Sequence, residues 1–162
     1  MDVVIRLADI KDSEEILKLI KELAEFENEL EKVELNLMDI KNDGFGKNPI
    51  FKCFVAEYID SIVGIALFYP RYSTWKGPTF HLEDLIVTKT MKGKGIGTKL
   101  LYAFVNYAKN EGIKRVEWEV LDWNKKAIDF YNKNGAKIFN DWKIVKMSSK
   151  SMINFLAKKK VR

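Results

Sequence analysis

The chain has 162 residues, of which 47% are hydrophobic and 12% aromatic, and this is enough for the packed core of one ordinary domain. Lys and Arg number 28 against 23 Asp and Glu, and a net charge of +5 with both signs spread along the chain does not indicate a nucleic acid partner. The single cysteine, Cys53, excludes an internal disulfide and a cysteine-rich zinc site, and we expect no metal. Cys53 lies in an apolar strand-like run, so we expect it to pack in the core.

Two further patterns concern location. The first residues lack the basic start and the apolar stretch of a secretion signal. The longest apolar run, residues 62–70, is much shorter than the roughly 20 residues that span a bilayer. We therefore expect a cytoplasmic protein that forms one domain over residues 1–162, with neither a membrane nor a nucleic acid as partner.

The first half of the chain predicts a strand, a helix and a hairpin. Residues 3–7 are strand-like, and a helix is expected to begin at Asp12, where Glu15 follows at the spacing of a capping box. Two β-branched and aromatic runs, 51–58 and 62–69, are separated by three residues and predict an antiparallel hairpin. Residues 79–87 predict a third strand of the same sheet.

The second half alternates predicted helices and strands. A Lys- and Gly-rich segment leads into a helix of about four turns that ends at Gly112. A strand at 114–121, a short helix at 125–134, a strand at 142–147 and a basic helix at 151–159 are expected to follow. This order favours parallel pairing in the second half, beside the antiparallel hairpin. The predicted class is a mixed-sheet α/β domain.

Three glycines lie within five positions between the third strand and the long helix, at 93, 95 and 97. Their spacing fits neither a Walker loop nor a dinucleotide fingerprint. Glycines let the backbone approach a ligand closely, and the free N–H groups of a first helical turn favour anions. With Lys92 and Lys94 beside them, the glycines predict a pyrophosphate cradle. The simpler alternative is a flexible connection with solvated lysines.

A second cluster follows one strand–helix unit later, at Asn124, Ala127 and Tyr131. Tyr131 shares a helix face with Ala127, and alone it is most simply a core-edge aromatic. At this separation, Lys92-x-x-Gly95-x-Gly97 and Asn124…Tyr131 resemble the Gcn5-related N-acetyltransferase (GNAT) superfamily. The resemblance implies acetyl-CoA as cosubstrate and a mostly antiparallel sheet with a splayed parallel strand pair and helices on both faces. It also implies cofactor contacts from Leu85, Ile86, Val87, Lys92, Gly93, Lys94, Gly95, Ile96, Gly97, Thr98, Asn124, Ala127 and Tyr131.

The strings at 20–27, 43–46, 72–77 and 82–84 resemble the diamine acetyltransferase branch, which contains spermidine/spermine and thialysine acetyltransferases. Ser73-Thr74-Trp75 is more similar to the thialysine side, because the polyamine enzymes carry an acidic residue at the place of Ser73. The resemblance implies a small-molecule primary amine as acceptor, with thialysine or a lysine-like amino acid favoured and polyamines possible, and it implies a homodimer. The acceptor site that it implies comprises Phe26, Glu27, Trp75, Glu83 and Asp84, with Glu117 and Glu119 as weaker candidates.

Acyl transfer to an amine needs a proton acceptor, because an alkyl ammonium with a pKa near 10.4 is about one part in a thousand neutral at pH 7.4. Glu83 is the best candidate, since partial burial in an apolar strand would raise its pKa; the alternative is a solvated carboxylate. Asp84 lies on the other face if the alternation is regular, but a β-bulge could turn both toward the cleft. The hydroxyl of Tyr131 could protonate the departing thiolate.

Two other functions remain open at this point. A protein lysine or amino-terminal acetyltransferase would share the cofactor site but would need an open groove for a peptide. A non-catalytic sensor would bind coenzyme A without turnover. With no cysteine placed for an acyl-enzyme, the catalytic hypothesis is direct transfer in a ternary complex.

Overall fold

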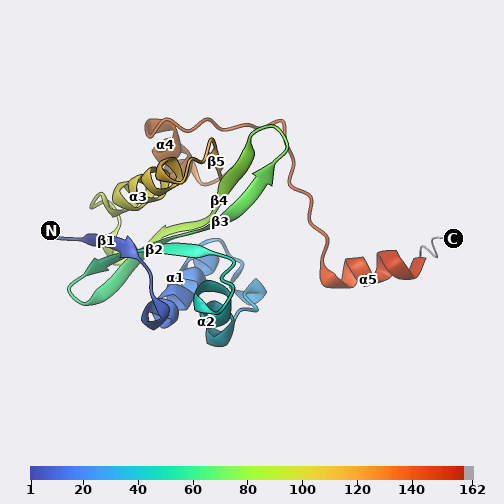
Figure 1. The fold of residues 1–162 in the computed structure, drawn as a ribbon, viewed down its shortest axis with the longest axis horizontal. Coiled ribbons are helices and arrows are strands. Elements are labelled where there is room, and N and C mark those ends of the chain that lie inside the picture. The colour runs from blue at the N-terminus through green and yellow to red at the C-terminus, as the bar shows by residue number, and fades with distance from the viewer. Residues whose placement is uncertain (159–162) are drawn as a thin grey trace. The chain divides into compact units, whose positions relative to one another are not determined.

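The computed structural model describes residues 1–158, and the chain divides into two compact units, Met1–Glu119 and Val120–Arg162. The first unit contains a five-stranded sheet in the order β1-β2-β3-β4-β5. All neighbours are antiparallel except β4 and β5, which pair in parallel (Figure 1). The strands are Val4–Leu7, Lys52–Tyr58, Ser61–Ser73, Gly77–Val87 and Val116–Glu117. This sheet confirms the predicted mixed α/β class.

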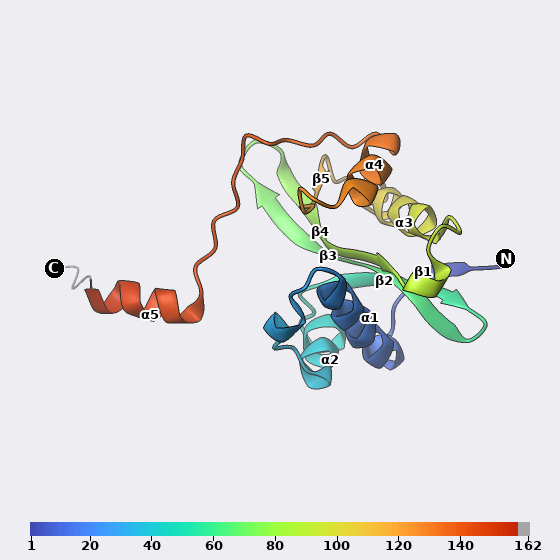
Figure 2. The ribbon, with the colours of Figure 1, turned by 180° about the vertical axis from the view of Figure 1, so that it is seen from behind.

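Helices cover both faces of the sheet. Helices α1 (Ser13–Phe26) and α2 (Leu37–Phe45) lie on one face, and α3 (Ile96–Asn110) lies on the other (Figures 1 and 2). The sequence analysis does not predict α2. Its signal is a capping box, in which the Asn36 side chain accepts from the N–H groups of Met38 and Asp39 while Asp39 accepts from the N–H of Asn36.

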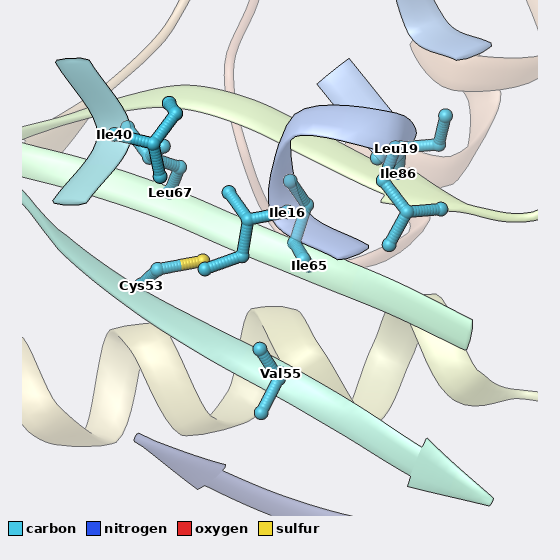
Figure 3. Packing of buried hydrophobic residues seen from close by; sticks show 8 residues of the cluster. All are labelled: Ile16, Leu19, Ile40, Cys53, Val55, Ile65, Leu67 and Ile86. Carbon is cyan, nitrogen blue, oxygen red and sulfur yellow. The ribbon is translucent and has the colours of Figure 1, made fainter. Parts of the chain in front are cut away.

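The core under α1 is aliphatic. Ile16 and Leu19 from α1 and Ile40 from α2 lie against strand residues of the sheet, as Figure 3 shows. The thiol of Cys53 is buried among them, which confirms its predicted packing role. The core under α3 is aromatic instead: the rings of Phe104 and Phe68 have centroids 5.0 Å apart, and both side chains are fully buried. Burial of this apolar area fixes both helices on the sheet.

The start of α1 differs from the prediction in one detail. The capping box forms one turn earlier, between Asp9 and Asp12, in the short 3-10 helix η1 (Ile10–Asp12). Asp12 forms a salt bridge with Arg6, and the two terminal nitrogens of Arg6 donate to the Asp12 carboxylate at 2.7 and 2.9 Å. The Arg6 guanidinium holds the pKa of Asp12 below its usual value. An aspartate held in this way is not available to cap with Glu15.

The second unit contains α4 (Lys125–Lys133) and α5 (Ser149–Lys158). The predicted strand at 142–147 is wrong: these residues pair with no strand within the described chain, and the Trp142 and Val145 side chains are 75% and 92% exposed. A strand needs a partner, which no sequence pattern supplies. The predicted strand 114–121 is reduced to Val116–Glu117. The last residue of the predicted basic helix, 159, lies outside the described residues, as do the basic residues at 160 and 162.

Among the described residues, no helix is both long enough and apolar enough to cross a bilayer.

Candidate active site

A β-bulge in β4 brings two carboxylates to one face of the sheet. Leu67 of β3 pairs with Asp84, whereas the next residue, Phe68, pairs with Leu82, so Glu83 is the extra residue of β4. Since cross-strand partners share a face, Asp84 lies on the α1 side with Leu67. Glu83 faces the same side, because its carboxylate accepts from the hydroxyl of Tyr69 at 3.1 Å. The bulge that the sequence analysis allowed for is present.

Glu83 is supported by two residues that the sequence analysis did not place in the site. Besides Tyr69, the Nε2 atom of His81 lies 3.6 Å from Glu83 Oε2. His81 is nearly buried, and its Nδ1 lies 3.5 Å from the guanidinium of Arg71. Burial, together with the nearby carboxylate of Glu83, raises the pKa of Tyr69 to about 12, so its hydroxyl stays a donor to Glu83. The Glu83 side chain itself is 53% exposed, more than the sequence analysis expects.

The burial expected at Glu83 is found at its neighbour. Desolvation raises the pKa of Asp84 to about 7, and the negative charges of Glu83 and Glu27 add to the effect. Glu27 ends α1 as its C-cap residue, so its influence on Asp84 places the end of that helix beside the carboxylate pair. A carboxyl group that titrates near neutral pH can hold a proton or release it under physiological conditions. The arrangement is therefore suited to proton transfer.

Beyond the bulge, β4 has an edge without a partner. The parallel pairing of β4 with β5 is limited to Phe80–Val116 and His81–Glu117. In the part of the chain that the structure describes, residues 82–87 of β4 pair only with β3. This separation agrees with the predicted splay of the parallel pair. Backbone groups of successive residues alternate between the two edges of a strand, so within residues 85–87 those that point away from β3 could bond to the amides of an extended arm.

The glycine segment ends in an uncapped helix start. Gly95 is the N-cap of α3 and supplies no side-chain cap, so the N–H groups of the first turn are left for a ligand. Gly93 and Gly95 both have φ near +78°, which favours glycine, and a side-chain carbon built on either would meet only open space. Backbone donors, open space and two lysines suit a diphosphate.

Lys92 links this segment to the end of α1. Its ammonium lies 4.8 Å from the ring centroid of Phe26, the last residue of α1 and 45% exposed. Lys94 is directed back to the sulfur of Met91 at 3.2 Å. Phe26, expected to contact the acceptor, is thus in contact with Lys92, which is expected to contact the cofactor.

Of the three remaining acceptor candidates, one lies apart from the carboxylate pair, one is engaged in ion pairs and one lies close enough to Tyr69 to affect its pKa. Trp75 is 79% exposed in the turn between β3 and β4, and the strand from Gly77 to Glu83 is about 20 Å long. Glu117 is engaged by Arg71 at 2.9 Å and by Arg115 at 2.8 Å. Glu119, the last residue of the first unit, contributes a charge felt by Tyr69.

In the second unit, Asn124 and Tyr131 belong to α4. The side chain of Asn124 caps the helix by accepting from the N–H of Ala127 at 3.2 Å. Tyr131 lies one turn after Ala127 on the same face and is 8% exposed. Capping and helical spacing therefore place Asn124, Ala127 and Tyr131 along one side of this short helix.

The model for the acetyltransferase (GNAT) family matches residues 14–136. The chain belongs to the GNAT acetyltransferase family. It is accordingly an N-acetyltransferase that uses acetyl-CoA, the cosubstrate of GNAT acetyltransferases.

Two curated relatives support this assignment. A thialysine N-epsilon-acetyltransferase from Mus musculus is 41% identical over 141 residues, which cover 82% of this chain and 83% of the relative. A spermidine/spermine N(1)-acetyltransferase-like protein 1 from Homo sapiens is 40% identical over 82% of this chain and 20% of its own length.

Among solved structures, an integron cassette protein from V. cholerae has a TM-score of 0.79 at 22% identity, covering 98% of this chain and 99% of that one. The aminoglycoside N-acetyltransferase AAC(6')-Iy in complex with CoA has a TM-score of 0.72 at 16% identity, covering 90% and 94%. At these identities the structures establish the fold, and they confirm the predicted GNAT architecture.

Proposed function

We propose that this GNAT enzyme transfers the acetyl group of acetyl-CoA to the primary amine of a small cationic molecule, with thialysine or another lysine-like amino acid preferred to polyamines. The observation that carries the proposal is the bulge in β4, which directs Glu83 and Asp84 to one face near Glu27. Three carboxylates near one another attract a cationic amine. The relatives named for thialysine acetylation support the choice of substrate class.

The carboxylate pair gives this reaction a proton acceptor. Deprotonating an ammonium with a pKa near 10.4 costs roughly 4 kcal/mol at neutral pH, so a proton acceptor in the site can lower the barrier. The ionised pair first binds the ammonium and then takes its proton, directly or through water. Asp84, with a pKa of about 7, suits the acceptor role, and the hydrogen bond from Tyr69 keeps Glu83 oriented.

The acetyl group passes directly to the amine in a ternary complex. The one cysteine, Cys53, is fully buried, and burial raises the pKa of its thiol, so it is a poor nucleophile. In this proposal the diphosphate of acetyl-CoA is bound at residues 92–98, and the pantetheine arm runs along Leu85, Ile86 and Val87. Asn124, Ala127 and Tyr131 complete the cofactor site, with Tyr131 as proton donor to the thiolate.

We also propose that residues 1–162 form one GNAT domain. The family match over residues 14–136 continues across the boundary between the two compact units, which lies after Glu119. The cytoplasm is the proposed compartment, in keeping with a buried free cysteine.

A substrate panel tests the activity. With acetyl-CoA fixed, we expect the highest kcat/KM for thialysine and lysine-like amino acids, lower values for spermidine and spermine, and no turnover of lysine-containing peptides. Release of coenzyme A without any amine is the background control. Preference for peptides would indicate a protein acetyltransferase, and tight coenzyme A binding with no turnover on any amine would indicate a sensor; either result would contradict the proposal.

The homodimer is a separate prediction. The second unit exposes large apolar side chains, among them Trp142, Val145 and Leu156 at 75%, 92% and 70%, and no residue of α5 is buried. Apolar area of this extent favours association with a second copy. Light scattering coupled to size exclusion should give about twice the 18.9 kDa chain mass. A monomer at micromolar concentration would contradict the dimer but leave the proposed chemistry intact.

A further inference from the structure

Glu22 connects α1 to a segment more than sixty residues later in the chain. One carboxylate oxygen, Oε1, accepts from the backbone N–H of Lys89 at 2.8 Å, and the other, Oε2, accepts from the hydroxyl of Thr88 at 2.9 Å. Thr88 and Lys89 follow directly after β4 and begin the segment that leads to the glycines at 93, 95 and 97. Glu22 therefore forms hydrogen bonds with the start of the segment that contains the proposed diphosphate site.

The contact replaces a local helix cap. Thr88 is the N-cap of the short 3-10 helix η3 (Lys89–Met91), but its own side chain does not cap that helix. Its hydroxyl donates to Glu22 instead, and Glu22 takes the N–H of Lys89. The backbone of Thr88 is also held, since its N–H donates to the carbonyl of Val63 at 2.9 Å. With the cation of Lys92 over the ring of Phe26, both ends of residues 88–92 are held, and each is in contact with α1.

The negative charge of Glu22 is unfavourable for binding an anion nearby, which indicates that its hydrogen bonds have a compensating role. A carboxylate close to a diphosphate site repels the ligand, and among residues 1–158 Glu22 forms no ion pair that would neutralise it. Electrostatics alone would therefore favour a neutral residue here. The glycine-rich segment, by contrast, loses much conformational freedom when it is ordered around a ligand, and an anchor at its start reduces that loss.

We propose that Glu22 is a positioning residue for acetyl-CoA, which orders the segment from Thr88 to Gly97 before the diphosphate binds. This inference rests on the cofactor site proposed above. In this proposal Glu22 acts through the residues that it holds, the Thr88 hydroxyl and the backbone N–H of Lys89. Its effect belongs to cofactor affinity and not to the transfer step.

Calorimetric titration of the full chain with coenzyme A, without amine, tests the inference. We expect Glu22→Ala to weaken binding about tenfold and Glu22→Gln, which keeps one acceptor oxygen, to weaken it less. Both variants lose a negative charge, and the electrostatic effect of that loss alone would strengthen coenzyme A binding. Weaker binding would therefore show that the hydrogen bonds of Glu22 outweigh the effect of its charge. The KM for acetyl-CoA should rise in proportion, while kcat at saturation stays within twofold. Glu31→Gln, at an exposed glutamate of the same charge, is the matched control.

A second variant keeps the inference testable if Glu22→Ala fails to fold. Thr88→Val removes only the hydroxyl contact, and we expect about threefold weaker binding. In the Glu22→Gln background the same change should have a smaller effect, because the two groups share one interaction. Unchanged or tighter coenzyme A binding in folded Glu22 variants, or a lower kcat with unchanged KM, would overturn the inference. The variant Gly95→Asp tests the proposed diphosphate site itself, separately from the role of Glu22. It should abolish coenzyme A binding, and normal binding by Gly95→Asp would mean that the diphosphate lies elsewhere.

Discussion

Asp84→Asn should lower kcat/KM for the preferred amine about thousandfold while making the folded protein more stable at pH 8. The loss of activity follows from removing the acceptor of the ammonium proton, which offsets roughly 4 kcal/mol of barrier. The Asn side chain keeps the volume and the polarity of Asp, so binding of acetyl-CoA should stay unchanged. Steady-state kinetics with the amine varied and coenzyme A titration in parallel separate the two effects.

The gain in stability of Asp84→Asn arises because the variant avoids burying an ionised carboxylate, and it depends on pH. Asp84 has a pKa of about 7 in the folded chain against an ordinary value of 3.8, so the folded state binds the proton more tightly than the unfolded state. Stability contributed by this carboxyl is present below about pH 4 and is lost as the pH rises to about 7. At pH 8 the cost is at most about 4 kcal/mol, and Asn removes it. Thermal unfolding of both proteins between pH 4 and 8 should show curves that converge at the acid end.

The pH dependence of activity provides a matched control. For the wild-type enzyme, kcat/KM should fall below about pH 7 as Asp84 becomes protonated. Because the charge of Glu83 raises the pKa of Asp84, Glu83→Gln should shift this acid limb to lower pH and reduce activity less than Asp84→Asn does. Full activity of Asp84→Asn combined with an inactive Glu83→Gln would assign the proton to Glu83 alone.

Tyr131→Phe should lower kcat about a hundredfold and leave the affinity for coenzyme A nearly unchanged. Phe retains the ring of a side chain that is only 8% exposed on α4, so packing is preserved, while the hydroxyl that we propose protonates the thiolate is removed. Burst and steady-state measurements at saturating acetyl-CoA report kcat, and calorimetry reports affinity. Tyr102→Phe removes a hydroxyl from a tyrosine that is 72% exposed on α3 and is the control. Wild-type turnover in Tyr131→Phe would remove this residue from the mechanism.

Local patterns in the sequence predict those elements whose structure depends mainly on neighbouring residues. The glycine spacing and apolar periodicity predicted the segment 92–97 and the helix α3 that follows it. Cys53 was correctly placed in the core, because a lone cysteine in an apolar strand has no other partner. The sequence also contains a local signal for α2, since Asn36 and Asp39 have the spacing of a capping box.

Features that depend on pairing between distant residues could not be predicted. The bulge at Glu83 exists only in the register of β4 against β3, so alternation alone placed Asp84 on the opposite face. Residues 142–147 have strand-like composition but no partner in the described chain. The contact of Glu22 with Thr88 and Lys89 could not be predicted either, because these partners are more than sixty residues away in the sequence.

In the proposed binding mode, the unpaired edge of β4 also limits which acyl donors fit. From Glu83 to Val87 the strand rises about 13 Å, and the proposed diphosphate site begins five residues after Val87, at Lys92. A donor anchored by its diphosphate and extended along this edge therefore presents its thioester at a fixed distance, close to the carboxylates. A longer acyl chain cannot be accommodated by sliding the donor back, so its additional carbons must project past Glu83 into the space that the amine needs.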